Sequence, residues 1–186
     1  MRVVPIAVTA LAVAFALTAC DDSGGDGGGD KTATSTAGAG STAGSKSGTG
    51  CRLDGVGVQV GPAGEAPAAG DTGIVPVTLT NRGATCTLQD FPGIELTTGD
   101  ASYDVAGDKR AKPLKLTLKK GETATFTVTY VRGASGGRNS AAVTDMNISL
   151  PGSDAQAGYS WKYGDVSLKS GGRPDASVSS FQQAGD

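Results

Sequence analysis

The sequence of 186 residues contains no histidine. This absence excludes Ser-His-Asp and Cys-His catalysis, and it excludes zinc or copper sites with histidine ligands. Aromatic residues are scarce, at 5% of the chain with a single tryptophan. A basic surplus is also missing, since 16 Lys and Arg residues stand against 18 Asp and Glu. Residues 51–186 have a charge balance of about −1 by the same count, so we expect no nucleic-acid partner.

Long apolar runs are limited to the N-terminus. Val3 to Leu17 is uncharged and follows Arg2, but it is at the short limit for a membrane span of about 20 residues. The run contains Pro5 and ends in small residues, which is typical of a cleavable export signal. We therefore predict a signal peptide over residues 1–19.

The end of this signal resembles a bacterial lipobox, with the sequence Leu17-Thr18-Ala19-Cys20. The resemblance implies that the Cys20 thiol receives diacylglycerol and that cleavage leaves Cys20 as the new N-terminus. Acyl chains buried at about 0.8 kcal/mol per CH₂ would hold the protein on the outer face of the cell membrane. An ordinary secretory signal followed by a chance cysteine is the alternative.

The segment from residue 20 to residue 50 is poor in side chains that can form a core. Of its 31 residues, 24 are Gly, Ser, Thr or Ala, and none is aromatic or branched aliphatic. Such a segment cannot offset the entropy lost on ordering. We predict a disordered tether with a reach of about 30 Å, whose serines and threonines are also candidate sites for O-linked sugars. Residues 51–186 then form one domain.

Within this domain apolar residues recur with a period of two rather than with helical spacing. Turn signals such as Asn81-Arg82-Gly83, Pro92-Gly93 and Pro151-Gly152 separate these segments. Short strands with one apolar face predict two antiparallel sheets packed face to face, with Pro76 in an edge strand or at a bulge. The predicted strands fall within residues 56–60, 75–80, 94–96, 114–119, 124–130, 146–150 and 159–163.

Two cysteines remain in the domain, Cys51 and Cys86. With Cys20 lipidated they are the only thiols left, and an exported protein meets oxidising conditions. We therefore predict a disulfide between them. A redox or nucleophilic role has little support, because the chain has neither a Cys-x-x-Cys motif nor a histidine base.

A block of motifs surrounds the second cysteine: Asn81-Arg82-Gly83, then Cys86-Thr87-Leu88, then Phe91-Pro92-Gly93, with Lys120-Gly121-Glu122-Thr123-Ala124 further on. This block resembles the actinobacterial family of exported lipoprotein domains of unknown function. The resemblance implies an immunoglobulin-like β-sandwich with the Cys51–Cys86 bridge, and it implies no agreed activity. Physically, Asn81 and Gly83 tolerate φ > 0 and are expected to turn the chain. Phe91 is expected to close one end of the sandwich.

Catalysis without histidine would need paired carboxylates, a Ser-Lys pair or a metal held by acids. The acids of the domain are scattered, and the sequence leaves open whether Glu95 meets another acid across a strand. Lys109-Arg110-Ala111-Lys112, with Lys115, Lys119 and Lys120, is the densest basic stretch. It is either a solvated surface or a contact for anionic headgroups or polymers. We expect no enzyme activity, no catalytic residues, no metal and no cofactor.

Tyr159, Trp161 and Tyr163 share one face of a strand if the two-residue period holds. Such a row either fills the core or forms a stacking surface for a glycan, and the core is favoured because the domain has so few aromatic residues. We therefore expect a lipid-anchored extracytoplasmic protein, monomeric, whose sandwich binds an envelope protein or a glycan. A carboxylate-based envelope hydrolase or a carbohydrate-binding module is the alternative.

Overall fold

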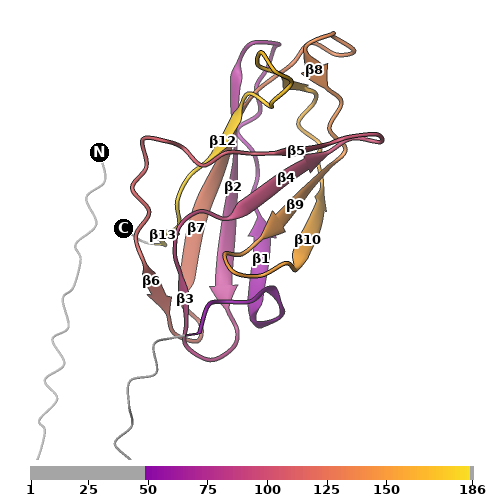
Figure 1. Ribbon diagram of the computed structural model, residues 1–186. Coiled ribbons are helices and arrows are strands. Elements are labelled where there is room, and N and C mark those ends of the chain that lie inside the picture. The colour runs from indigo at the N-terminus through magenta and orange to yellow at the C-terminus, as the bar shows by residue number, and fades with distance from the viewer. Residues whose placement is uncertain (1–48, 185–186) are drawn as a thin grey trace, which may run out of the picture. The chain divides into compact units, whose positions relative to one another are not determined.

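A computed structural model describes residues 49–184 (Figure 1). The predicted signal peptide (residues 1–19), the predicted lipidation site Cys20 and nearly all of the predicted tether lie outside the described residues. Within them the elements are η1 (Leu53–Gly55, a 3-10 helix), β1 (Val56–Val60), β2 (Thr72–Asn81), β3 (Cys86–Leu88), β4 (Gly93–Thr97), β5 (Ser102–Asp104), β6 (Leu116–Leu118), β7 (Thr123–Val131), β8 (Ser140–Ala141), β9 (Asp145–Ser149), β10 (Gln156–Ser160), β11 (Val166–Ser167), β12 (Ala176–Val178) and β13 (Gln182–Gln183).

Two antiparallel sheets form the body of the domain. The larger sheet has the order β1-β2-β7-β12, and β13 pairs with β7 further along its length. The second sheet has the order β10-β9-β4-β5, and its strands lie across those of the first sheet in Figure 1. The pairs β11-β8 and β3-β6 are short additions. This arrangement confirms the predicted immunoglobulin-like antiparallel β-sandwich.

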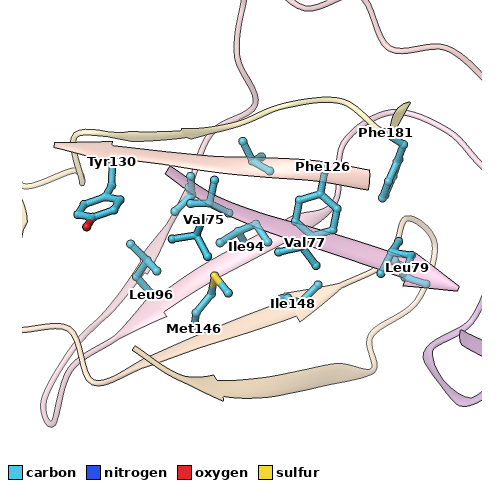
Figure 2. Close-up of a cluster of buried hydrophobic side chains, with 14 of the residues drawn as sticks. Val75, Val77, Leu79, Ile94, Leu96, Phe126, Tyr130, Met146, Ile148 and Phe181 are labelled. Carbon is cyan, nitrogen blue, oxygen red and sulfur yellow. The ribbon is translucent and has the colours of Figure 1, made fainter. Parts of the chain in front are cut away.

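The core lies between the inward faces of the long strands. In β2 and β7 buried and partly exposed side chains alternate along the whole strand, which is the two-residue period seen in the sequence. Full burial of a Val, Leu, Ile or Phe side chain contributes about 1.5–3 kcal/mol, so these faces hold the two sheets together. Figure 2 shows the inward side chains, which include Val75, Val77, Leu79, Ile94, Leu96, Phe126, Tyr130, Met146, Ile148 and Phe181.

The predicted strand over residues 114–119 is shorter than expected. Strand β6 begins at Leu116, and Leu114 is 68% exposed instead of facing the core. Among residues 49–184 the only strand paired with β6 is β3, whose last residue, Leu88, lies opposite Leu116. Two residues later the chain turns away at Asp90, which has a φ of 62°. Leu114 therefore has no neighbouring strand to pack beside.

Pro76 does not lie in an edge strand. It is in β2, between β1 and β7, opposite Gly61, which comes directly after the end of β1. The Gly61 N–H donates to the Pro76 carbonyl at 2.8 Å, and the next pairing joins Gly64 to Ile74. Between these two pairings the chain advances three residues on the β1 side, from Gly61 to Gly64, but only two in β2, from Pro76 to Ile74. This extra residue is a bulge, and Pro76 lies beside it, where no ladder donor is needed.

Asn81 ends β2 with a buried side chain that is 1% exposed. Its Nδ2 donates to the carbonyls of Ala84 and Leu118, both at 2.9 Å, and its Oδ1 accepts from the Gly83 N–H at 3.0 Å. Neither Asn81 nor Gly83 has a positive φ. The expectation that these residues turn the chain through a left-handed conformation is therefore wrong. The Asn81 side chain holds the turn by bonding to three backbone groups, of which the Gly83 N–H also donates to the Gly55 carbonyl at 3.1 Å.

Phe91 packs against the core and is partly buried, which confirms that it is a packing residue. Its ring lies over Gly107, where an added Cβ would meet three ring carbons at 2.9–3.0 Å. Gly93 already belongs to β4. The predicted turn at Pro92-Gly93 therefore occurs earlier, at Asp90.

Candidate functional site

The aromatic residues at the end of β10 form a cluster with a partner from β7. Trp161 is 6% exposed, and its ring meets those of Tyr130 and Tyr163 edge-on, with centroids 5.0 and 4.8 Å apart. The Tyr130 and Tyr163 rings are 6.4 Å apart. Edge-to-face pairs at these distances contribute about 0.5–1.5 kcal/mol beyond burial. The cluster is part of the core, as the sequence favoured for Trp161.

Only one of the three aromatic residues singled out from the sequence lies within a strand. Strand β10 ends at Ser160, so it contains Tyr159, opposite Met146 of β9, but not Trp161 or Tyr163. The Trp161 N–H still donates to the Thr144 carbonyl at 2.7 Å, and exposed Ser160 and Lys162 alternate with the more buried rings. The strand is therefore shorter than predicted, while the two-residue alternation continues through Tyr163. Since Tyr159 and Tyr163 are half-buried against the core, these rings do not form an exposed stacking surface.

Two polar groups of the cluster have hydrogen bonds. The Trp161 Nε1–H donates to the Gly164 carbonyl at 2.7 Å, and the Tyr130 hydroxyl donates to the Tyr163 carbonyl at 3.2 Å. Burial raises the pKa of the phenols of Tyr130, Tyr159 and Tyr163 above the ordinary value of 10.0. The raised pKa keeps these phenols protonated, which suits their place against the core.

Sequence reasoning missed Tyr130 as the centre of this cluster. It appeared only as the last inward residue of the 124–130 alternation, and a two-residue period cannot show which ring lies across the core. The next residue but one also has a role that the sequence did not suggest. The Arg132 guanidinium donates from Nη1 to the carbonyls of Ala66 and Pro67 at 2.7 and 3.2 Å. It thereby fixes the loop between β1 and β2.

The predicted disulfide joins Cys51 and Cys86, with a sulfur–sulfur distance of 2.08 Å. Both residues are buried, and the Cys51 N–H donates to the Thr87 carbonyl at 2.9 Å. The bridge therefore attaches the start of the domain to β3. Its burial and its bonded state indicate a structural role rather than a reactive thiol.

The structure answers the question that the sequence left open for Glu95. Its cross-strand neighbour is Asp104 of β5, and Asn147 of β9 lies on its other side and donates from Nδ2 to Glu95 Oε1 at 3.0 Å. Directly opposed residues have Cβ atoms about 4.5–5.5 Å apart. The two acids thus lie side by side on the outer face of one sheet. Glycosidases instead place their two carboxyl groups on opposite sides of the bond to be cut.

The first residue of the predicted basic stretch, Lys109, lines a hollow. The opposite wall of this hollow is the hairpin that contains Lys169 and Arg173. The hollow has a volume of about 200 Å³. It is continuous with a second hollow of about 360 Å³, since both are lined by Ala106, Lys109, Lys169 and Ala176. We call this region the basic cleft. Its remaining charged lining residues are Asp104, Asp108, Arg110 and Arg173.

Two other features are absent from the described part of the chain. Residues 49–184 contain no group of three or more Cys, Asp or Glu side chains that could hold a metal ion. In the same range no helix is long and apolar enough to cross a membrane.

Comparison with known proteins gives one match. A family model described as a domain of unknown function (DUF4232) matches residues 51–182, which is well over half of the chain. No curated protein and no solved structure matches the chain.

Proposed function

We propose that this chain, which belongs to that family of domains of unknown function, is a lipid-anchored extracytoplasmic binding module of the actinobacterial exported lipoprotein type. The lipobox-like Leu17-Thr18-Ala19-Cys20 supplies the anchor, and the segment that follows it supplies a spacer. The ligand is an envelope protein or a glycan-containing polymer. The chain acts as a monomer.

The observation that carries this proposal is the Cys51–Cys86 disulfide directly behind the spacer. Disulfides persist in oxidising compartments and are rare in the reducing cytosol. A buried structural bridge at the start of the domain therefore supports export. It also tethers the first residues of the domain to β3, so that a pull on the spacer is borne by a covalent bond.

A binding role is preferred over catalysis because of how the polar groups lie. The Glu95 and Asp104 side chains are neighbours on a sheet face, and the Glu95 carboxylate already accepts a hydrogen bond from Asn147. The aromatic rings of the Trp161 cluster are turned into the core. The basic cleft, by contrast, presents charged groups in a concave surface, which is a geometry that suits a ligand.

Fractionation of an expressing bacterial cell tests the anchor. Cys20→Ala should leave the membrane fraction and appear in the medium or as unprocessed precursor, because the acyl chains would have no attachment point. Ser23→Ala, a change of similar size in the spacer, should stay in the membrane fraction. If Cys20→Ala remains processed and membrane-bound, the lipoprotein proposal is wrong. If the anchor is confirmed, proximity crosslinking from the intact cell surface would identify the partner of the anchored protein.

The alternative, a carboxylate-based hydrolase, makes a different prediction at the same sheet face. Hydrolysis would require both acids, so Glu95→Gln would abolish any activity on envelope glycans. The binding proposal expects no such activity in the unmodified protein.

A further inference from the structure

We infer that the basic cleft binds the phosphate groups of a linear polyanion. This assignment rests on the proposed function as a binding module and names the chemistry of its ligand. The cleft lies between the segment that follows β5 and the hairpin that precedes β12. In Figure 1 the chain leaving β5 passes across β12 before it descends to β6.

Two cations of the cleft have no partner within the described chain. Arg110 is engaged by Asp108, with Nε and Oδ1 3.4 Å apart, and Lys169 is engaged by Asp175, with Nζ and Oδ1 2.8 Å apart. The side chains of Lys109 and Arg173 make no hydrogen bond or ion pair with any residue from 49 to 184. These two outnumber Asp104, the one lining acid without a basic partner in that range. The cleft is therefore locally positive in a domain of nearly balanced charge.

The hairpin also places two like charges opposite each other. Leu168 and Pro174 form an antiparallel bridge, and the Lys169 N–H donates to the Arg173 carbonyl at 2.8 Å. Lys169 and Arg173 are thus directly opposed across the hairpin, where like charges destabilise a ladder pair. Asp175 offsets only one of them. A bound anion would offset the charge of Arg173 and so relieve the repulsion between the two cations.

One wall of the cleft is attached to β12 and the other to β7, so the site is formed in advance. The Asp108 N–H donates to the Val178 carbonyl, and the Val178 N–H donates to the Ala106 carbonyl, at 2.8 and 3.0 Å. On the hairpin side the Val131 N–H of β7 donates to the Asp175 carbonyl at 2.8 Å. A ligand that enters a fixed site loses little affinity to ordering of the protein.

The charges that extend from the cleft favour a linear polymer over a flat surface. Between Asp108 and Glu122 the chain has six cations and no acid. Arg110, Lys112 and Lys115 are exposed along the segment that leads from the cleft to β6. A planar membrane cannot follow a concave hollow, whereas one unit of a polymer can enter it while its neighbours meet these side chains. Phosphate is the group that we assign, since the Arg173 guanidinium can bind it with two parallel hydrogen bonds. A carboxylate can accept the same pair of bonds, so a polycarboxylate is the comparison probe.

Calorimetric titration of the full protein from an exporting host tests this inference, with short-chain polyphosphate as the probe. The double variant Lys109→Gln/Arg173→Gln should weaken binding about tenfold or more, and its affinity should depend less on salt. The control Lys162→Gln/Arg82→Gln removes the same two charges at exposed positions outside the cleft lining. It should bind within about twofold of the unmodified protein. Asp104→Asn should bind more tightly, because it removes an acid from the cleft.

Several results would overturn the inference. Equal weakening in the two double variants would show a general charge effect, and polyglutamate binding as tight as polyphosphate would remove the preference for phosphate. Binding to phosphatidylglycerol vesicles without binding to soluble polyphosphate would make the surface a membrane contact. If crosslinking finds an envelope partner while the cleft variant binds normally, the binding module stands and the cleft assignment falls. If the chain stays in the cytosol, the proposed function falls, whatever the titration gives.

Discussion

Truncation of Trp161 should remove a large share of the stability of the domain. The side chain is 6% exposed, and a buried indole removes about 150–250 Å² from water. At about 25 cal/mol per Å² this gives about 4–6 kcal/mol, an upper estimate because unfolded chains already bury part of that surface. Trp→Ala changes in other cores cost about 3–5 kcal/mol. We expect Trp161→Ala to lower the free energy of unfolding by about 3–5 kcal/mol, out of the 5–15 kcal/mol typical of a domain.

Urea unfolding followed by far-ultraviolet circular dichroism measures this loss. Trp161→Phe keeps a ring between Tyr130 and Tyr163 but loses the donor to the Gly164 carbonyl, so its cost should be intermediate. Leu114→Ala is the control, because that side chain is 68% exposed and should change stability by less than about 0.5 kcal/mol.

As the only tryptophan, Trp161 also reports its own surroundings. Its native emission should be blue-shifted and poorly quenched by acrylamide, and it should turn red on unfolding. A red, easily quenched native emission, or an alanine variant as stable as the unmodified protein, would refute the core placement and restore the glycan-stacking alternative.

Two further changes test the disulfide and the packing of β2 against Tyr130. The Cys51–Cys86 bridge closes a 35-residue separation, so Cys86→Ser should lower the free energy of unfolding by about 4 kcal/mol on the chain-entropy model; a non-reducing mass that shows two free thiols in the exported protein would contradict the bridge. Gly73→Ala should cost about 1–3 kcal/mol by overpacking, because the added Cβ would meet the Tyr130 ring. Gly99→Ala, where a Cβ meets nothing within 4 Å, should be nearly neutral, and equal melting temperatures for the two glycine variants would speak against the packing described.

The long strands were predictable because packing on one face imposes a strict period. β2, β7 and β9 each present alternate buried residues to the core, and their sequences show it. The short strands β5, β8, β11, β12 and β13 have two or three residues each, too few for a period to be visible. Three of them depend on a longer partner that offers free hydrogen-bonding groups, namely β4 for β5 and β7 for β12 and β13, whereas β8 and β11 pair with each other.

The sequence also predicted only part of the candidate site, because it shows local patterns but not contacts between distant segments. The disulfide followed from the count of thiols and from the expected compartment, and both are properties of the sequence. The predicted strand over residues 159–163 is shorter in the structure, since β10 ends at Ser160, although alternate burial and the bond from the Trp161 N–H to the Thr144 carbonyl continue beyond that point. The sequence indicated only one side of the basic cleft. Lys109 lies in a run of cations, whereas Lys169 and Arg173 belong to a hairpin far along the chain.

The aromatic cluster and the basic cleft are joined through the end of β7. Tyr130 contributes its ring to the cluster, and the next residue, Val131, donates its N–H to the carbonyl of Asp175. Asp175 in turn holds the Lys169 ammonium at 2.8 Å, and its own N–H donates to the Ser167 carbonyl at 2.7 Å. The hairpin is therefore bonded to a strand whose preceding residue, Tyr130, is fixed by the aromatic cluster. Packing of these rings thus limits movement of the charged hairpin, and a ligand of the proposed cleft would lose little affinity to ordering of the protein.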